Sequence, residues 1–189
     1  MEKDEFLSDM RKRSALELAS FYFSRNEAAA FTSAASYQEF VAVVQQEVGG
    51  GPQVAVVGTG NWQYSLNPYK SFKRFDEKSD IDVAVVSAEM FHNTWEQIRY
   101  VHRRTWWSIN YDARSSFLRN GENVYCGFVS PKWIPGPTNS YRFKHISMLN
   151  RLSNQSPGQR EVKMMFFKNE TEAIDYYRRG FQLAKWSIR

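Results

Sequence analysis

The sequence predicts an α+β (mixed α/β) fold, in which helices flank a central mixed sheet of about four strands and further helices precede it. Two observations predict this fold. Short β-branched apolar runs of strand length recur along the chain, and longer stretches with helical spacing of apolar residues separate them. The chain has 189 residues, of which 42% are hydrophobic. We therefore expect one domain over residues 1–189, with a helical part at 1–50 and the sheet-containing core at 53–189.

The N-terminal part is predicted to contain two helices. Apolar residues at helical spacing predict the first helix over residues 3–25. The second begins at a capping box of Ser36 and Glu39, in which each side chain can satisfy a backbone N–H of the other residue. The three glycines at 49–51 are expected to end this helix.

The core is predicted to alternate strands with helices. Its last helix is expected to begin at Glu170, because Asn169 can cap it and Glu172 stands at the third helical position. The preceding elements, in chain order, are strand 53–58, strand 81–87, helix 92–107, strand 123–130, a proline-rich loop at 131–140, helix 141–153 and strand 161–168.

Two aspartates, Asp80 and Asp82, stand at the start of the second predicted strand. Residues two apart in a strand point to the same face, so these carboxylates should project together. Carboxylates this close repel each other, and a divalent cation between them relieves the repulsion. Oxygen ligands of this kind suit Mg²⁺ or Mn²⁺. The alternative is that Asp80 caps a turn and Asp82 faces water.

A turn of small and polar residues follows the first predicted strand. Gly58 and Gly60 allow the backbone to approach a ligand closely. The backbone N–H groups of this turn and the Thr59 hydroxyl can bond phosphate oxygens, and Asn61 is a further candidate. The turn and the aspartate pair together predict a site for a nucleotide's triphosphate.

The segments VVGTG and SDIDVAVV resemble the signature of the nucleotidyltransferase fold superfamily, the DNA polymerase β-like group. The resemblance is specific over residues 54–87. Gly58 matches the glycine of the signature, Thr59 stands at its Gly/Ser position, and Asp80 and Asp82 match its two metal-binding aspartates. The resemblance implies a nucleotidyltransferase-like sheet, Mg²⁺ (or Mn²⁺) as cofactor, and transfer of a nucleoside monophosphate from ATP or another NTP. Small members also serve in toxin–antitoxin and phage-defence systems.

The spacer at residues 60–79 is longer than the usual gap of the superfamily. Its basic and aromatic residues predict either a substrate loop over the site or a surface hairpin that packs its own aromatic side chains. Lys70 and Lys73 are candidate contacts to phosphates. Ser79 is a candidate contact beside the aspartate pair, or a residue that orders the turn.

The superfamily usually supplies a third carboxylate from a later strand, where it helps to activate the acceptor hydroxyl. The predicted strand 123–130 contains no acidic residue inside it. Glu161, at the start of the last predicted strand, is the leading candidate for a third metal ligand or general base. Asp112 is the second candidate. If neither residue supplies the third carboxylate, the protein would bind nucleotide without turning it over.

The charge is divided unevenly along the chain. Residues 1–98 contain 9 Lys/Arg and 14 Asp/Glu, whereas residues 99–151 contain 9 Lys/Arg and 2 Asp/Glu. A basic half attracts polyanions, so RNA, including tRNA, is the predicted acceptor. Trp106, Trp107 and Trp133 lie in this basic region, where they could stack on unpaired bases or pack in the core. A protein partner or an oligomer is left open.

Several classes of protein and site are disfavoured. The charged N-terminus lacks the apolar region of a signal peptide, and no apolar run is long enough for a membrane span. Cys126 is the single cysteine, which excludes a disulfide framework and fits a reducing cytoplasm. The three histidines show no metal-ligand spacing, and no GxxxxGK[ST] or GxSxG motif is present.

These observations support a first hypothesis of a cytoplasmic, Mg²⁺-dependent nucleotidyltransferase. The second hypothesis is a catalytically inactive relative that senses a nucleotide or binds RNA. A third is a structural or interaction subunit in which the acidic pair has no ligand.

Overall fold

A mixed sheet forms the centre of the computed structural model, which describes residues 2–136 and 139–188. Within these residues four strands pair in the order β1-β2-β4-β3, and this confirms the predicted fold class. β1 is antiparallel to β2, β2 is parallel to β4, and β3 is antiparallel to β4. The strands are β1 (Gln53–Val57), β2 (Ile81–Val86), β3 (Phe128–Val129) and β4 (Val162–Phe167).

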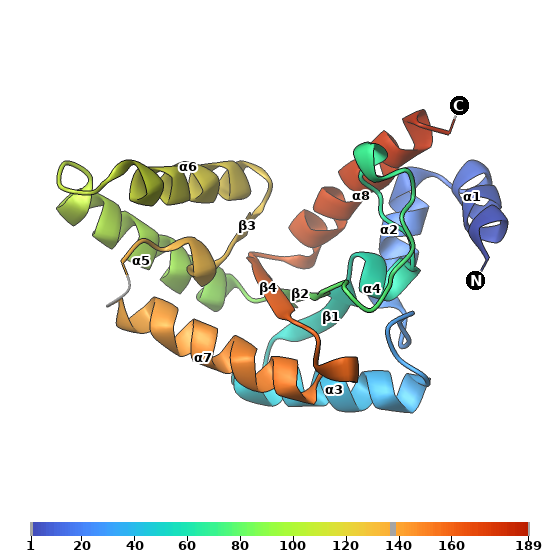
Figure 1. Ribbon diagram of the computed structural model, residues 1–189, viewed down its shortest axis with the longest axis horizontal. Coiled ribbons are helices and arrows are strands. Elements are labelled where there is room, and N and C mark those ends of the chain that lie inside the picture. Colours follow the sequence, from blue (N-terminus) through green and yellow to red (C-terminus); the bar gives the residue numbers. More distant parts are fainter. Residues whose placement is uncertain (1, 137–138, 189) are drawn as a thin grey trace.

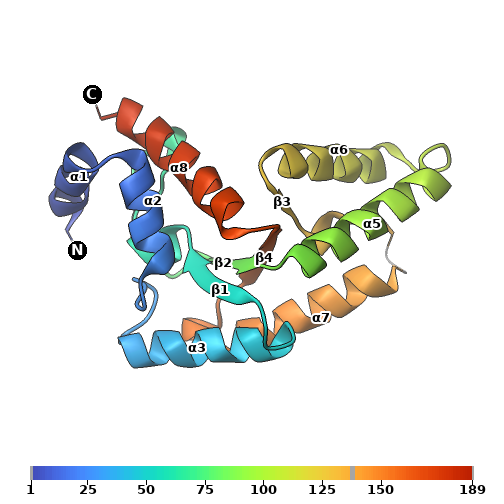
Figure 2. The same cartoon turned by 180° about the vertical axis from the view of Figure 1, so that it is seen from behind.

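Helices cover both faces of this sheet (Figures 1 and 2). α1, α2 and α8 lie on one face and α3 and α7 on the other, while α5 and α6 form a hairpin that extends away from the sheet. The helices are α1 (Lys3–Lys12), α2 (Ala15–Ser24), α3 (Ala34–Glu47), α4 (Thr59–Trp62), α5 (Ala88–Thr105), α6 (Tyr111–Tyr125), α7 (Ser140–Gln155) and α8 (Glu170–Trp186), with short 3₁₀ turns at Pro68–Lys70, Pro131–Trp133 and Pro157–Gln159.

The alternation of side chains along the strands divides the core in two. Ile81, Val83 and Val85 of β2 pack with α3 and α7. Ala84 and the partly buried Val86 pack with α1, α2 and α8 instead. Successive strand residues point to opposite faces, so Asp82 belongs to the α8 face of the sheet. The sequence pattern of the strand thus decides on which side the functional residues lie.

The N-terminal segment forms two helices, so the prediction of one helix over residues 3–25 is wrong. The break follows Arg13, where Ser14 caps α2. The Ser14 hydroxyl accepts a hydrogen bond from the Glu17 N–H, and the Glu17 carboxylate accepts one from the Ser14 N–H. This capping box starts a new helix, because it satisfies donors that would otherwise be unpaired. It lets α2 turn onto α8, where Tyr22 stacks on Phe181 with 5.7 Å between ring centroids.

Two other helix starts lie upstream of their predicted positions. α3 is capped by Ser33, whose hydroxyl accepts from the Ser36 N–H at 3.1 Å, so the predicted Ser36–Glu39 capping box is wrong. α5 begins after Ser87, whose hydroxyl accepts from the Met90 N–H. In each case the hydroxyl of an upstream serine accepts a hydrogen bond from a backbone N–H of the first turn, so the helix begins there.

The predicted strand 123–130 is wrong for most of its length. Residues 123–125 end α6, which Asn110 caps through a bond from the Ala113 N–H. The chain then turns at Gly127, with φ of 91°, and only Phe128 and Val129 pair with β4. Val124 packs against the core from this helix, whereas Tyr125 is exposed on it. Residues 137–138 of the predicted loop lie outside the described residues.

The last helix begins as predicted. The Asn169 side chain accepts a hydrogen bond from the Glu172 N–H at 2.9 Å, and α8 runs from Glu170. Over the residues that the structure describes, we find no helix that combines the length and the apolar character needed to span a bilayer.

Candidate active site

The candidate site forms where β1 ends and β2 begins. Val57, the last residue of β1, pairs with Asp82 across the antiparallel ladder, and Gly58 follows with φ of 68°. A Cβ atom at Gly58 would lie 2.7 Å from Oδ2 of Asp82. The position therefore requires glycine on two grounds, because L side chains disfavour this φ and because the carboxylate occupies the space.

The spacer between the two strands both packs and borders the site. Tyr64 and Arg74 form an isolated antiparallel bridge, and the Ser65 N–H donates to the Lys73 carbonyl at 2.9 Å. Trp62 and Tyr64 are buried against the α8 side of the core. Lys70, in contrast, lines the cavity that contains the aspartates. The packing alternative thus holds for Trp62 and Tyr64, and Lys70 borders the cavity.

A cavity of about 760 Å³ contains the aspartate pair. This volume falls within the roughly 300–1,000 Å³ of small-molecule sites. Arg119 of α6 and Tyr176, Tyr177 and Arg179 of α8 contribute to its wall. Its polar floor is lined by Gly58, Thr59, Lys70, Asp80, Asp82 and Lys163.

Lys163 is the cation that contacts the aspartate pair directly. It stands directly beside Asp82 in the parallel register of β2 and β4, and its ammonium donates a hydrogen bond to Oδ2 of Asp80. Burial alone would lower the pKa of Lys163, but the bond to Asp80 and the surrounding carboxylates outweigh burial and raise that pKa. The lysine is therefore charged at neutral pH.

Asp82 is the less favourably placed carboxylate. Burial raises its pKa to about 6, and the negative charge of Asp80 adds to the rise, while Lys163 and Lys70 oppose it. A carboxyl whose ionised form is disfavoured in this way gains from a second positive charge beside it. A cation bound beside Asp82 would therefore stabilise the ionised form of its carboxyl group.

Two polar groups in the wall of the cavity are unpaired. The indole N–H of Trp62 and the hydroxyl of Tyr177 are buried and have no hydrogen-bond partner among the described residues. Both side chains line the cavity, and their ring centroids lie 5.5 Å apart. Burial raises the pKa of Tyr177 well above its usual value, so the phenol keeps its proton. Each group retains an N–H or O–H to donate.

Gly60 and Asn61, which we predicted to contact nucleotide, do not line the cavity. Both are buried. The Asn61 amide donates to the Tyr22 carbonyl at 2.7 Å and to the Val56 carbonyl at 2.8 Å. Asn61 therefore joins α2 to β1.

Ser79 and Lys73 organise the turn before Asp80 and likewise do not line the cavity. The Ser79 hydroxyl donates to Oδ1 of Asp76 at 2.9 Å, and Lys73 forms an ion pair with Asp76 at 2.8 Å. Arg160 donates to the Asp76 carbonyl at 2.7 Å. These contacts support the turn that precedes the aspartate pair.

The predicted third carboxylate, Glu161, acts on Asp82 only through its negative charge, which adds to the raised pKa of Asp82. The exposed Glu161 forms an ion pair with Lys132 at 3.2 Å and does not line the cavity. Asp112 lies exposed in the first turn of α6 and is also absent from the lining. Within the described residues there is no group of three or more His, Cys, Asp or Glu side chains that could hold a metal ion.

Lys163 is a cavity residue outside the predicted set. Its signal is a single charged side chain inside the otherwise apolar strand VKMMFF. Tyr177 had no such signal, because a tyrosine at helical spacing is usually a packing residue.

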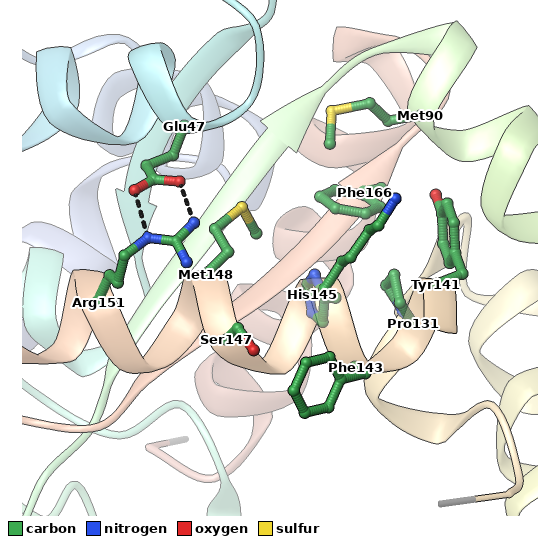
Figure 3. A pocket seen from close by; sticks show the side chains of 11 residues that line it. Glu47, Met90, Pro131, Tyr141, Phe143, His145, Ser147, Met148, Arg151 and Phe166 are labelled. Carbon is green, nitrogen blue, oxygen red and sulfur yellow. Dashed lines mark hydrogen bonds and ion pairs between the residues drawn. The ribbon is translucent and has the colours of Figure 1, made fainter. Parts of the chain in front are cut away.

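A second cavity, of about 450 Å³, lies on the opposite side of the sheet between α3, α7 and β4 (Figure 3). Glu47 and Arg151 close one end through hydrogen bonds of 2.9 and 2.7 Å. His145 lies in the middle, buried against Phe166, and its Nε2 has no hydrogen-bond partner among the described residues. Burial lowers the pKa of His145 to about 4, and the charge of Lys132 adds to this. The imidazole is therefore neutral at pH 7.

Comparison of the chain with protein-family models, curated proteins and solved structures finds no match in any of the three.

Proposed function

We propose that the cavity around Asp80 and Asp82 binds an NTP with one Mg²⁺ ion, and that the chain transfers the nucleoside monophosphate to a hydroxyl of RNA. The observation that carries this proposal is the convergence of both carboxylates, Lys70 and Lys163 in one cavity, with Gly58 set closely against Asp82. Two carboxylates beside two ammonium groups suit a ligand that consists of a cation and a triphosphate.

The residues present fit one magnesium ion. Mg²⁺ commonly takes one or two protein carboxylates and completes its octahedron with water and substrate phosphates. Asp80 and Asp82 would hold it, and Mg²⁺ would supply charge that stabilises the phosphate oxygens as the bond breaks. Because Glu161 pairs with Lys132, the donor set does not extend to a second ion.

The residues of the chain would bind and orient the substrate. Lys70 and Lys163 line the cavity and would pair with phosphate oxygens, and the Thr59 hydroxyl would donate to one. In the reaction the acceptor hydroxyl oxygen bonds to the α-phosphorus, and the bond from that phosphorus to the oxygen bridging to the β-phosphate breaks. Pyrophosphate leaves with the electron pair, and the hydroxyl proton passes to water.

The test is transfer of label from each α-labelled NTP to cellular RNA, with Mg²⁺ or with EDTA. We expect label with Mg²⁺ only, and a loss of at least about 100-fold in Asp82→Ala, because removing a group that acts in the transition state typically costs 10²-fold or more. Asp4→Ala is the matched control, since Asp4 is exposed on α1 and lies outside the cavity. Undiminished transfer by Asp82→Ala would refute the proposal.

A second candidate function is nucleotide sensing without turnover. It is favoured by Lys163, which stands beside Asp82 while Glu161 is engaged elsewhere. This function predicts Mg²⁺-dependent NTP binding by calorimetry with no labelled product for any of the four NTPs. Lys163→Asp would then be informative, because it places a third carboxylate on the strand that adjoins Asp82.

A further inference from the structure

The hairpin of α5 and α6 has an inner side that packs and an outer side that does not. On the inner side His102 and Phe117 meet with 5.1 Å between ring centroids, and Trp106 lies 6.2 Å from Phe117. These contacts hold the two helices together as they extend away from the sheet (Figures 1 and 2). The exposed side chains of the hairpin therefore stand on two helices that pack against each other.

Large apolar side chains are exposed at a regular spacing along α6, and the middle one, Leu118, lines the groove between α5 and α6 together with Arg103. Tyr111, Leu118 and Tyr125 of α6 are 82%, 64% and 91% exposed. They are seven residues apart, which places them on one face of the helix. Trp107, in the turn that joins the two helices, is 90% exposed. Exposed apolar side chains that are grouped in this way usually mark an interaction surface.

Arginines accompany these side chains. Residues 99–119 contain Arg99, Arg103, Arg104, Arg114 and Arg119 against a single acidic residue, Asp112. The exposed Arg103 makes no hydrogen bond or ion pair with the described residues. The Arg104 guanidinium lies over the ring of Tyr100 at 5.2 Å, so cation and aromatic side chain already form one unit.

The surface leads to the candidate active site. Arg119, near the middle of α6, and Cys126, directly after the helix, line the cavity that contains Asp80 and Asp82. From Tyr111 to Tyr125 the helix rises by about 20 Å at 1.5 Å per residue. A strand lying along this face would therefore reach from the tip of the hairpin to the mouth of the cavity.

We propose that this face of the hairpin binds single-stranded RNA. Trp107, Tyr111 and Tyr125 stack on unpaired bases, and Arg103 and Arg119 pair with phosphates. Positive charge interleaved with exposed aromatic side chains complements a single strand, which offers both phosphates and open base faces. Arg99 and Arg119 already form ion pairs with Glu96 and Glu122. An apolar protein partner would complement the exposed apolar residues but would leave Arg103, Arg104 and Arg114 without counter-charges. The role of the surface in delivering an acceptor rests on the proposed function, whereas RNA binding does not.

The test measures binding of a fluorescein-labelled single-stranded RNA by anisotropy, in EDTA and without NTP. We expect Trp107→Ala and the double variant Tyr111→Ala/Tyr125→Ala each to bind about tenfold more weakly, given the usual contribution of a stacked base. Trp186→Ala is the matched control, because this tryptophan is 56% exposed on α8, on another element. Circular dichroism and melting temperature check that each variant is folded.

Salt dependence tests the arginines separately. Arg103→Ala should lower the slope of log K against log salt concentration by about 0.7, the value for one phosphate contact on a single strand. An unchanged slope would show that Arg103 does not contact a phosphate and would contradict its assigned role.

The inference would be overturned by no RNA binding by the wild-type chain, by equal binding by the aromatic variants and the wild type, or by equal affinity for a duplex of the same sequence. A dimer that Tyr111→Ala/Tyr125→Ala converts to monomer would also overturn it, by showing a self-interface. RNA binding that depends on the hairpin, without nucleotidyl transfer, would support the inference and contradict only the proposed enzymatic function.

Discussion

At the scale of the residue, the absence of one methyl group sets the position of Asp82. Gly58 → Ala would place a Cβ 2.7 Å from the Asp82 carboxylate, at a φ of 68° that alanine disfavours. We expect a loss of at least about tenfold in the affinity for Mg²⁺ and NTP, measured by calorimetry. Gly50→Ala is the control, because Gly50 has φ of 81° and nothing within 4 Å of its Cβ position. It should lose about 1–2 kcal/mol of stability and keep its affinity.

A second prediction concerns the buried His145. Its pKa is lowered from 6.5 to about 4, so the unfolded chain takes up a proton between these pH values and the folded chain does not. The stabilisation from the neutral imidazole is thus fully present above pH 6.5 and is lost as the pH falls towards 4, by about 3 kcal/mol.

Denaturant titrations over this pH range measure the effect. The free energy of unfolding of His145→Leu should fall less steeply with decreasing pH than that of the wild type. The exposed His92 provides the control variant, His92→Leu. Identical slopes for wild type and His145→Leu would contradict the role of burial at this position.

At the scale of the element, one buried amide joins the end of α2 to β1. Asn61, in the single turn of α4, donates to the carbonyls of Tyr22 and Val56. Asn61→Ala should lower the free energy of unfolding by about 2–4 kcal/mol, because it removes two hydrogen bonds from buried groups. The control is Asn67→Ala, which removes only a cap of an exposed turn, a bond from the Tyr69 N–H, and should cost about 1 kcal/mol.

This prediction also decides how Asn61 acts. If Asn61 is structural, its replacement lowers the stability of the nucleotide-free protein, as measured by thermal unfolding in EDTA. If Asn61→Ala instead lost nucleotide affinity with unchanged stability, Asn61 would contact the nucleotide directly.

At the scale of the whole molecule, the N-terminal helices complete one of the two halves of the core. Phe6 and Met10 of α1 and Leu18 of α2 are buried with Phe181 of α8. The Lys185 ammonium of α8 donates to the Met10 carbonyl and so ties the two ends of the chain together. The helical part at 1–50 and the sheet-containing part at 53–189 therefore share their apolar contacts.

Removal of residues 1–24 should abolish cooperative unfolding, because it exposes the apolar face of α8 to water. The measurement is thermal unfolding followed by circular dichroism, with a chain that starts at Lys3 as the control. A cooperative transition in the chain that starts at Arg25 would show that the sheet and its remaining helices fold independently.

Local patterns made much of this fold predictable. The strands around 53–57, 81–86 and 162–167 follow from short apolar runs, and the start of α8 follows from Asn169, since a capping side chain acts on its own next turn. The strand expected at 123–130 failed, because residues 123–125 complete a helix that Asn110 starts and that packs through Phe117. Intrinsic strand preference is weak and tertiary packing overrides it.

The sequence by itself determined the mixed fold class and the shared orientation of Asp80 and Asp82, because the alternation of side chains along a strand is a local property. Only the tertiary structure decided that Lys163, and not Glu161, meets the aspartate pair. The physical reason is register: β2 and β4 are far apart in the chain, and their parallel pairing sets Lys163 beside Asp82. No local pattern encodes which residue of a distant strand that pairing brings in.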